Sequence, residues 1–373
     1  MQTRIIKIDP NQPDRQAVAE AIETLQGGGL VIFPTETVYG VGASVMHPDG
    51  TKRLRELKGR LDGKPFTVHI GQPFQADLYA VPMPLLAKRM IAKGWPGPLT
   101  LILPVDDISQ APIIRQVPAG QETELFSDNT VGLRCPDDWI ARQILTEAAP
   151  VVAASANLAG NIPPHTVEDA LAELDGRVDL AIDGGPTRYS QASTIVKIGQ
   201  QGYDIIREGI YDSRAIERLA TETWLFVCTG NSCRSPMAEG IARKLLAESL
   251  GCREDELTAR GYCLTSAGTM APLGGTASPG AVEACRTMDV DISAHRCQPV
   301  TLELIHQANR IFPMCRHHGD LIVAMAPSAR SKIVPLDPGG DIDDPIGGGQ
   351  NLYTECAQRI ALALRARLKE LPT

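Results

Sequence analysis

The side chains best suited to chemistry stand in one short segment, from Cys228 to Arg234. An apolar run ends at Cys228, a loop of small residues follows, and Pro236 suits the first turn of a helix. Such a turn directs backbone N–H groups and a helix N-terminus at one point, which favours an anion and a thiolate there. Arg234 adds a guanidinium fork for the same anion. The segment therefore predicts a phosphoryl-transfer site in which Cys228 attacks phosphorus and forms a thiophosphate.

Phosphoryl transfer also requires a general acid that protonates the leaving group. Residues 341–349 form a loop that is rich in carboxylates and glycine. Within it, Asp344 precedes Pro345, which keeps Asp344 out of helical geometry and lets it project from the chain. We therefore expect Asp344 to be the acid, while the loop amides and Arg234 stabilise the transition state.

The other cysteines give weaker signals. Nine cysteines occur, eight of them at or after Cys228, and no two are spaced as Cys-x-x-Cys. A secreted disulfide scaffold would be shorter, so free thiols are expected, and the alternative for Cys228 is a buried structural thiol. The segment Met-Cys-Arg-His-His at 314–318 has too few ligands near it for a metal site. We expect a strand end and loop there, with His317 and His318 in solvent, and predict no metal site.

The first half of the chain contains no Walker loop and no Gly-x-Gly-x-x-Gly after a predicted strand. Polar clusters instead follow short apolar runs at several distant points. Lys58, Arg60 and Lys64 can together clamp a triphosphate. Ser155 and Asn157, which follow the run Val-Val-Ala-Ala, offer hydrogen-bond donors to phosphate or ribose. Lys58 and Arg60 alone are more often part of a solvated face, and Ser155 and Asn157 alone more often belong to a turn, so the combination carries the prediction of a nucleotide site.

Composition narrows the class of protein. The length of 373 residues predicts two domains at ~100–200 residues each, and 43% hydrophobic residues suffice for ordinary cores. A formal charge of −8 argues against a general nucleic-acid coat protein. No apolar run reaches the ~18 residues of a membrane span, and the first residues lack the apolar region of a signal peptide. We therefore expect a cytoplasmic protein without membrane contact.

The apolar patterns predict alternating helices and strands in both halves, which indicates two α/β domains. In the first half we expect helices over 17–26, 51–58 and 85–93, and strands over 29–33, 66–70, 99–103, 131–134 and 151–154. In the second half we expect strands over 223–228 and 321–325, and helices over 236–250, 281–288, 301–307 and 353–370. Because 211–222 is polar and has no strand pattern, we place one domain at 1–210, a linker at 211–222 and a second domain at 223–373.

The second domain, over about residues 223–372, resembles the low-molecular-weight protein tyrosine phosphatase family. The resemblance rests on Cys-x5-Arg-Ser-Pro at the first strand–helix turn and on the late Asp-Pro. It implies a flavodoxin-like parallel sheet, no cofactor, Cys228 as nucleophile, Arg234 as phosphate binder and Asp344 as acid. It further implies that Cys233 can form a protective disulfide with Cys228. The phosphate loop that it implies contains Thr229, Gly230, Asn231, Ser232, Cys233 and Ser235, with Asn231 and Ser235 holding the loop and assisting the thiolate.

The substrate of this domain stays open between phosphotyrosine and phosphoarginine. Relatives that act on phosphotyrosine often have aromatic residues after the Asp-Pro, whereas Ile346 and three glycines follow here. The small polar Ser232 and the glycine-rich acid loop resemble the branch that removes phosphate from arginine. Arsenate reduction on a related fold is a third option.

The first domain, over about residues 5–210, resembles the YrdC-like threonylcarbamoyl-AMP synthase family. The motifs, in family order, are Pro-Thr-Glu-Thr-Val-Tyr-Gly at 34–40, Lys-x-Arg at 58–60, Gly-Pro-Leu-Thr at 97–100, Val-Gly-Leu-Arg at 131–134, Ser-x-Asn at 155–157, Ser-Thr-Ile-Val at 193–196 and Arg-Glu-Gly at 207–209. The resemblance implies a twisted α/β sheet with a concave positive cavity. The implied reaction joins L-threonine, bicarbonate and ATP, with Mg²⁺ on the phosphates, into threonylcarbamoyl-AMP and pyrophosphate.

The same resemblance implies which side chains contact each substrate. The implied nucleotide contacts are Lys58, Arg60, Lys64, Thr130, Asn157 and Arg207, and the implied threonine contacts are Thr35, His69, Arg134, Ser155 and Ser193. The product would supply threonylcarbamoyladenosine modification of tRNA, which links the protein indirectly to the transferase proteins of that pathway. The alternative is a regulatory module that binds nucleotide or RNA and is fused to a phosphatase acting on phosphoproteins.

Overall fold

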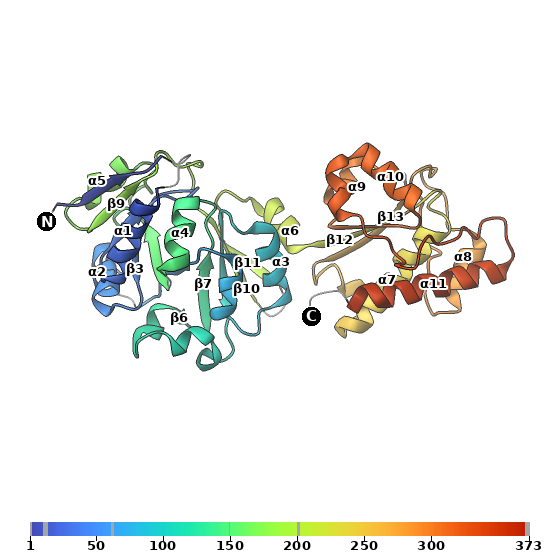
Figure 1. Cartoon of the computed structure of the whole chain (residues 1–373). Coiled ribbons are helices and arrows are strands. Elements are labelled where there is room, and N and C mark those ends of the chain that lie inside the picture. The colour runs from blue at the N-terminus through green and yellow to red at the C-terminus, as the bar shows by residue number, and fades with distance from the viewer. Residues whose placement is uncertain (1, 10–13, 61–62, 149, 200–201, 370–373) are drawn as a thin grey trace. The chain divides into compact units, whose positions relative to one another are not determined.

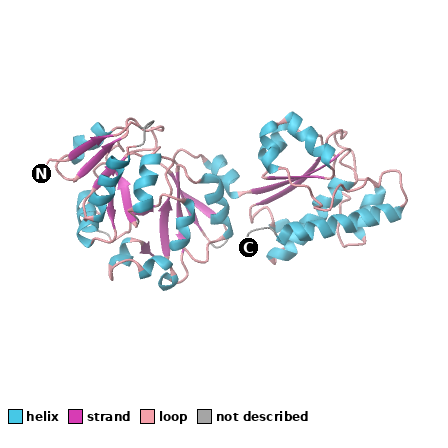
Figure 2. Ribbon diagram, in the orientation of Figure 1, coloured by secondary structure: helices cyan, strands magenta, loops and turns pink. Residues whose placement is uncertain are grey.

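The computed structural model describes residues 2–9, 14–60, 63–148, 150–199 and 202–369. The chain folds into two compact units, one that ends at Leu219 and one that begins at Ala220 (Figures 1 and 2). The segment expected as a linker contains helix α6 (Ser213–Ala220), in which Ile216 is buried and Leu219 packs beside Gly94. None of the helices in this described part of the chain is long and apolar enough to cross a membrane.

The first unit is built on one large mixed sheet. Its strands lie in the order β1 (Arg4–Lys7), β9 (Leu180–Asp183), β2 (Val31–Phe33), β3 (Gly40–Ser44), β8 (Val151–Ser155), β4 (Thr67–His69), β7 (Thr130–Arg134), β5 (Leu99–Pro104), β10 (Thr194–Ile198) and β11 (Tyr203–Arg207), and β6 (Phe126–Ser127) pairs with β7. Neighbours along the sheet come from distant parts of the chain: β10 pairs with β5 in parallel and β5 with β7 antiparallel. This arrangement brings strand ends from most of the unit to one place.

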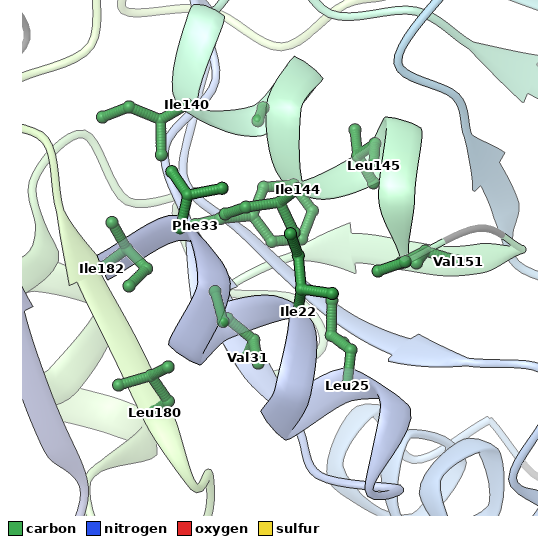
Figure 3. Packing of buried hydrophobic residues seen from close by; sticks show 14 of the residues in the cluster. Ile22, Leu25, Val31, Phe33, Ile140, Ile144, Leu145, Val151, Leu180 and Ile182 are labelled. Carbon is green, nitrogen blue, oxygen red and sulfur yellow. The ribbon is translucent and has the colours of Figure 1, made fainter. Parts of the chain in front are cut away.

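Two helices, α1 (Arg15–Gln26) and α4 (Trp139–Glu147), cover one face of β2, β8 and β9. Figure 3 shows Ile22 and Leu25 of α1 and Ile144 of α4 meeting around Phe33 of β2. Each of these side chains is nearly or fully buried, which contributes about 1.5–3 kcal/mol per residue to folding. The unit's other α-helices are α2 (Pro48–Lys58), α3 (Leu85–Gly94), α5 (Val167–Leu174) and α6.

The second unit is a doubly wound α/β fold. Its parallel sheet has the order β13 (Tyr262–Gly268), β12 (Glu222–Cys228) and β14 (Arg310–Pro313), so its first strand is central, as in flavodoxin-like folds. Leu225, Val227 and Ile311 pack against Ile305 and Ile322 on one face. The unit's α-helices are α7 (Arg234–Leu250), α8 (Pro279–Arg286), α9 (Leu302–Gln307), α10 (Arg316–Met325) and α11 (Gln350–Lys369).

One predicted element is wrong. Residues 321–325, expected as a strand, form the second half of α10, and the strand of this region is β14. The run Leu-Ile-Val-Ala-Met is short and apolar, which fits either element, and only Ile322 in it is buried, as on one helical face. Helix α10 begins at Arg316, so the loop expected up to residue 318 is wrong as well, and so is the expectation that His318 is in solvent, because it is only 2% exposed. The other expected elements are confirmed, with ends shifted by at most three residues, although residue 370 of the last expected helix lies outside the described residues.

Candidate active sites

In the second unit the candidate catalytic loop occupies the carboxyl end of the central strand. Cys228 is the last residue of β12 and Arg234 is the first residue of α7. Ligands of open parallel sheets bind outside this end of the strands, where the helix N-terminus also points. The sheet and the helix therefore position the loop that the sequence singled out.

Asn231 holds this loop in shape. Its backbone is left-handed, with φ of 52°, a conformation that asparagine adopts more readily than most residues. Its side-chain amide is fully buried and donates to Ser235 Oγ and to Ser266 Oγ, both at 2.9 Å. Its side-chain oxygen accepts from the backbone N–H of Gln298 at 2.9 Å. These bonds tie the loop to β13 and to α7, so its amides are fixed before any ligand binds.

The Cys228 thiol lies inside the loop and faces hydrogen-bond partners. Its Sγ is 3.2 Å from the backbone N of Asn231, which donates to it, and 3.0 Å from Ser235 Oγ. The Asn231 N–H stabilises negative charge on sulfur, as a nucleophilic thiolate requires, and the Ser235 hydroxyl does so when it donates to sulfur. Gly268 at the end of β13 makes room for the loop, because a Cβ there would lie 2.5 Å from the carbonyl oxygen of Thr229.

Arg234 connects the loop to the segment that carries the predicted acid. Its guanidinium is buried and donates through Nη1 to the carbonyl of Ile342 at 3.1 Å. Through Nη2 it donates to Thr229 Oγ1 at 3.5 Å and pairs with the Asp344 carboxylate. Asp344 is more exposed than Arg234, with 36% of its side chain accessible. The structure thus brings the predicted nucleophile loop, phosphate binder and acid together.

Two further features surround this loop. Cys233 lies at the start of α7 with its Sγ 3.2 Å from Ser278 Oγ, and all nine cysteines of the chain are free. His318, which the sequence analysis did not select, places Nε2 3.0 Å from Thr229 Oγ1. Burial, with a smaller contribution from Arg234, lowers the pKa of His318 to about 4, so its ring is neutral near pH 7. Thr229 and His318 are 89 residues apart in the sequence, so no motif spacing could indicate this contact.

In the first unit a cavity of about 700 Å³ opens where the ends of several strands meet. Its walls come from α2 and from strands β3, β4, β5, β7, β8, β10 and β11, together with the turn after β2. Nine of the residues that the sequence analysis selected line it: Thr35, Lys58, Arg60, His69, Arg134, Ser155, Asn157, Ser193 and Arg207. Side chains from most of the unit therefore converge on one cavity.

Lys58 and Arg60 stand at the end of α2, which Gly59 terminates with a left-handed φ of 60°. The Lys58 ammonium is buried and donates to the carbonyl of Ser155 at 2.8 Å and to the Oδ1 of Asn157 at 3.2 Å. Burial and then the Arg60 charge lower the pKa of Lys58 to about 8. The Arg60 guanidinium lies 4.6 Å over the ring of Phe66. Lys58 also donates to the Asn157 carbonyl at 2.5 Å, so its ammonium faces three neutral oxygens and brings a positive charge to this wall of the cavity.

Arg134 and His69 lie side by side at the ends of β7 and β4. The Arg134 guanidinium is buried, donates to Thr37 Oγ1 at 2.6 Å and pairs with Glu36 at 3.1 Å. Burial and then Arg134 lower the pKa of His69 to about 3, so this ring is neutral. Arg134 therefore brings a guanidinium that is already paired with Glu36 to this part of the cavity, and His69 offers a neutral polar surface.

Arg207 reaches the cavity from β11. Its Nη2 donates to the carbonyl of Ser193 at 2.7 Å, and burial, followed by repulsion from Arg134, lowers its pKa. The chain after Arg207 passes directly over residues 192–194, where a Cβ on Gly209 would lie 2.2 Å from the Ala192 carbonyl oxygen. Glycine at 209 is thus what allows β11 to end beside the cavity.

Two selected residues do not line this cavity. Thr130 lies at the opposite end of β7 from Arg134, and its hydroxyl donates to the carbonyl of Ser127 at 2.9 Å. Lys64 is exposed in the segment that follows α2. None of the described residues that line the cavity carries a carboxylate, and no group of three or more His, Cys, Asp or Glu in the described ranges could hold a metal. The cavity thus fits a polyanion, and a divalent cation would fit there when carried by that anion's phosphates.

These geometries define two classes of site, one that holds a polyanion with cations from many strands and one that holds a thiol in an anion-binding loop. The chain belongs to the Sua5/YciO/YrdC family, whose model, described as "Telomere recombination", matches residues 23–209. Residues 223–373 match the model described as "Low molecular weight phosphotyrosine protein phosphatase". The protein is thus a fusion of the two kinds of domain.

Individual relatives match one half each. A threonylcarbamoyl-AMP synthase from Bacillus subtilis is 36% identical over 212 residues, covering 57% of this chain and 58% of that protein. One from Pyrococcus abyssi is 31% identical over 227 residues, covering 60% and 64%. The chain therefore spans less than two thirds of these curated relatives. A solved low molecular weight protein tyrosine phosphatase from T. tengcongensis is 32% identical with a TM-score of 0.37, covering 40% of this chain and 100% of that one.

Proposed function

We propose that the protein is a bifunctional enzyme. The first unit converts L-threonine, bicarbonate and ATP into threonylcarbamoyl-AMP and pyrophosphate, for threonylcarbamoyladenosine modification of tRNA. The second unit is a cysteine-dependent phosphoprotein phosphatase. The observation that carries the first proposal is the convergence of Lys58, Arg134 and Arg207 on one cavity, whose described lining residues carry no carboxylate. The observation that carries the second is the Cys228 sulfur among the Asn231 amide and the Ser235 hydroxyl.

The synthase reaction needs positioning and charge neutralisation rather than a protein nucleophile. The threonine nitrogen attacks the carbon of bicarbonate, from which water leaves as the carbamate forms, and a carbamate oxygen then attacks the α-phosphorus of ATP while the bond to pyrophosphate breaks. Lys58, Arg60 and Arg207 neutralise the triphosphate, which brings Mg²⁺ with it. Thr35, Ser193 and Arg134 hold the threonine, with the Arg134 guanidinium on its carboxylate.

The phosphatase reaction proceeds in two displacements at phosphorus. The Cys228 sulfur forms a bond to phosphorus while the bond to the substrate oxygen or nitrogen breaks, and Asp344 protonates the leaving atom. The incoming phosphate takes the Arg234 donor that Asp344 holds in the free protein, which releases the carboxyl for this role. Water, which gives a proton back to Asp344, then attacks phosphorus while the S–P bond breaks, which releases phosphate and restores the Cys228 thiolate.

The first unit is tested by pyrophosphate release from ATP with purified protein. We expect release that requires both threonine and bicarbonate, and a large loss in Arg134→Met with nucleotide binding retained. Release that ignores threonine and bicarbonate, or ATP binding without release, would favour the alternative of a nucleotide- or RNA-binding regulatory module.

The second unit is tested with para-nitrophenyl phosphate and Cys228→Ser. Equal turnover by wild type and variant would remove Cys228 from the mechanism. The substrate class is then decided by kcat/KM on phosphotyrosine and phosphoarginine peptides, two substrates that differ in the atom that leaves.

We further propose that the protein works in the cytoplasm. All nine cysteines are free, and a reducing compartment keeps a nucleophilic thiol reduced. The synthase product would pass to transferase proteins that modify tRNA, which are the partners this proposal implies. A fraction of Cys228 that becomes disulfide-bonded to Cys233 under peroxide would support reversible protection of the nucleophile.

A further inference from the structure

One buried histidine of the second unit has no role in the two displacements described above. His318 lies in α10, whose first residues follow β14, and is 2% exposed. A fully buried polar ring usually satisfies the nearest backbone groups. Here both ring nitrogens contact side chains instead, with Nε2 3.0 Å from Thr229 Oγ1 and Nδ1 3.2 Å from Cys315 Sγ.

The contact on Nε2 leads directly to the phosphate binder. Thr229 Oγ1 accepts a hydrogen bond from Arg234 Nη2 at 3.5 Å. A guanidinium can only donate, so the Thr229 hydroxyl keeps its own proton for a neutral acceptor. The neutral ring of His318, whose pKa burial lowers to about 4, is such an acceptor at physiological pH. Arg234 therefore donates to the Thr229 hydroxyl, and the Thr229 hydroxyl donates to His318, so each of these hydrogen bonds has one donor and one acceptor.

We propose that His318 is a positioning residue of the phosphatase site, which orients the Thr229 hydroxyl and, through it, the Arg234 guanidinium that binds phosphate. This inference rests on the proposed phosphatase function. The Arg234 fork must lie in one plane to meet two phosphate oxygens, and Asp344 competes for the same Nη2 in the free protein. When Asp344 leaves, the Thr229 hydroxyl oxygen that His318 orients still accepts from the Arg234 guanidinium and restricts its rotation.

Two substitutions separate this role from simple packing. His318→Gln places an amide near the position of Nε2 and can replace the contact to Thr229, whereas His318→Asn places its amide near Nδ1 and cannot. We expect His318→Asn to raise KM for para-nitrophenyl phosphate and to weaken orthophosphate binding about tenfold, with His318→Gln close to wild type. Loss of Tm or of active fraction alone, with KM and orthophosphate affinity unchanged in both variants, would overturn the proposal.

The Thr229 hydroxyl provides a second, independent measurement. Thr229→Val removes the hydroxyl and should produce the same loss as His318→Asn. The double variant should be no worse than either single variant, because both remove one chain of bonds. Additive losses would show that His318 and Thr229 act separately and would overturn the proposal. His317→Ala, an exposed neighbour in the same helix, is the matched control and should remain within twofold of wild type.

Orthophosphate affinity, measured by titration calorimetry on the full chain, tests the positioning role of His318 separately from the proposed phosphatase function. Absence of Cys228-dependent turnover in wild type would overturn the proposed function. The positioning role would still be tested by whether His318→Asn binds orthophosphate more weakly than His318→Gln. Equal affinities in these two variants would overturn it whether or not the protein turns over substrate.

Discussion

The two candidate sites are built in opposite ways. The candidate loop of the second unit takes its proposed nucleophile, amides and guanidinium from one continuous segment, residues 228–235, and adds Asp344 from a distant loop. The synthase cavity takes its cations from the end of α2, from β7 and from β11, far apart in the chain. A covalent mechanism needs one reactive atom with close support, whereas a positioning mechanism needs charges spread over the length of a large substrate.

This contrast predicts that the loop is sensitive to the shape of a side chain as well as to its charge. Arg234→Lys keeps the positive charge but loses the planar fork that two phosphate oxygens require. We expect kcat/KM for para-nitrophenyl phosphate to fall about 10³-fold, with pyrophosphate release by the first unit unchanged. Arg243→Lys, at a partly exposed arginine that pairs with Glu239, is the control and should change neither activity. A loss below tenfold in Arg234→Lys would mean that charge alone suffices.

The cavity should be most sensitive where strands approach one another closely. Gly209→Ala would drive a Cβ into the backbone of residues 192–194 and displace Arg207 and Ser193 together. We expect threonine-dependent pyrophosphate release to fall about 100-fold, while the phosphatase activity stays intact. Gly199→Ala, where the nearest atom within 4 Å is the Gly202 oxygen at 3.8 Å, should stay near wild type. Equal effects of the two variants would show that the close backbone approach at Gly209 does not position Arg207 and Ser193.

The charge of the cavity should depend on pH. Because burial holds the pKa of Lys58 near 8, its ammonium is charged below that pH and becomes neutral above it. We expect KM for ATP to rise about tenfold between pH 7 and 9.5 as this cation is lost. Lys58→Met should already have the high KM at pH 7, so the two proteins should converge as the pH rises. Parallel curves would show that the lysine charge does not contact the nucleotide.

The smallest effect is expected at a residue that the cavity excludes. Thr130 bonds the Ser127 carbonyl at the far end of β7, so Thr130→Ala should change KM for ATP less than twofold. Asn157→Ala, which removes a side chain that holds Lys58 in the cavity, should raise it several-fold. A large effect of Thr130→Ala would place part of the nucleotide outside the cavity.

What the sequence could predict follows from the same contrast. The loop from Cys228 to Ser235 is one motif, so its strand, helix and local hydrogen-bond donors were predictable together. Asp344 was predictable as the acid from one further motif, the Asp-Pro at 344–345. For the cavity, nine of the lining residues were predicted, and their combination rested on the family resemblance, because no spacing rule connects Lys58 with Arg207 across the sheet.

The failures also have physical causes. Several strands were missed, among them β3 and β9, whose residues are small or mixed and which burial within the wide sheet of the first unit, rather than a local pattern, stabilises. The contact of His318 with Thr229 depends on how α10 packs under the loop, which no local pattern encodes. The run at 321–325 was misread for a related reason, since a short apolar run fits a helix or a strand equally.

Gly209 and Gly268 have a consequence for genetics. Each lies in a different unit, where a single added methyl group would collide with backbone at one site, and neither contributes a functional group of its own. Alleles that encode alanine at one glycine or the other would give cells with one enzyme silenced and the full-length chain still present. Comparing their growth would reveal whether selection maintains the fusion for both activities or for one.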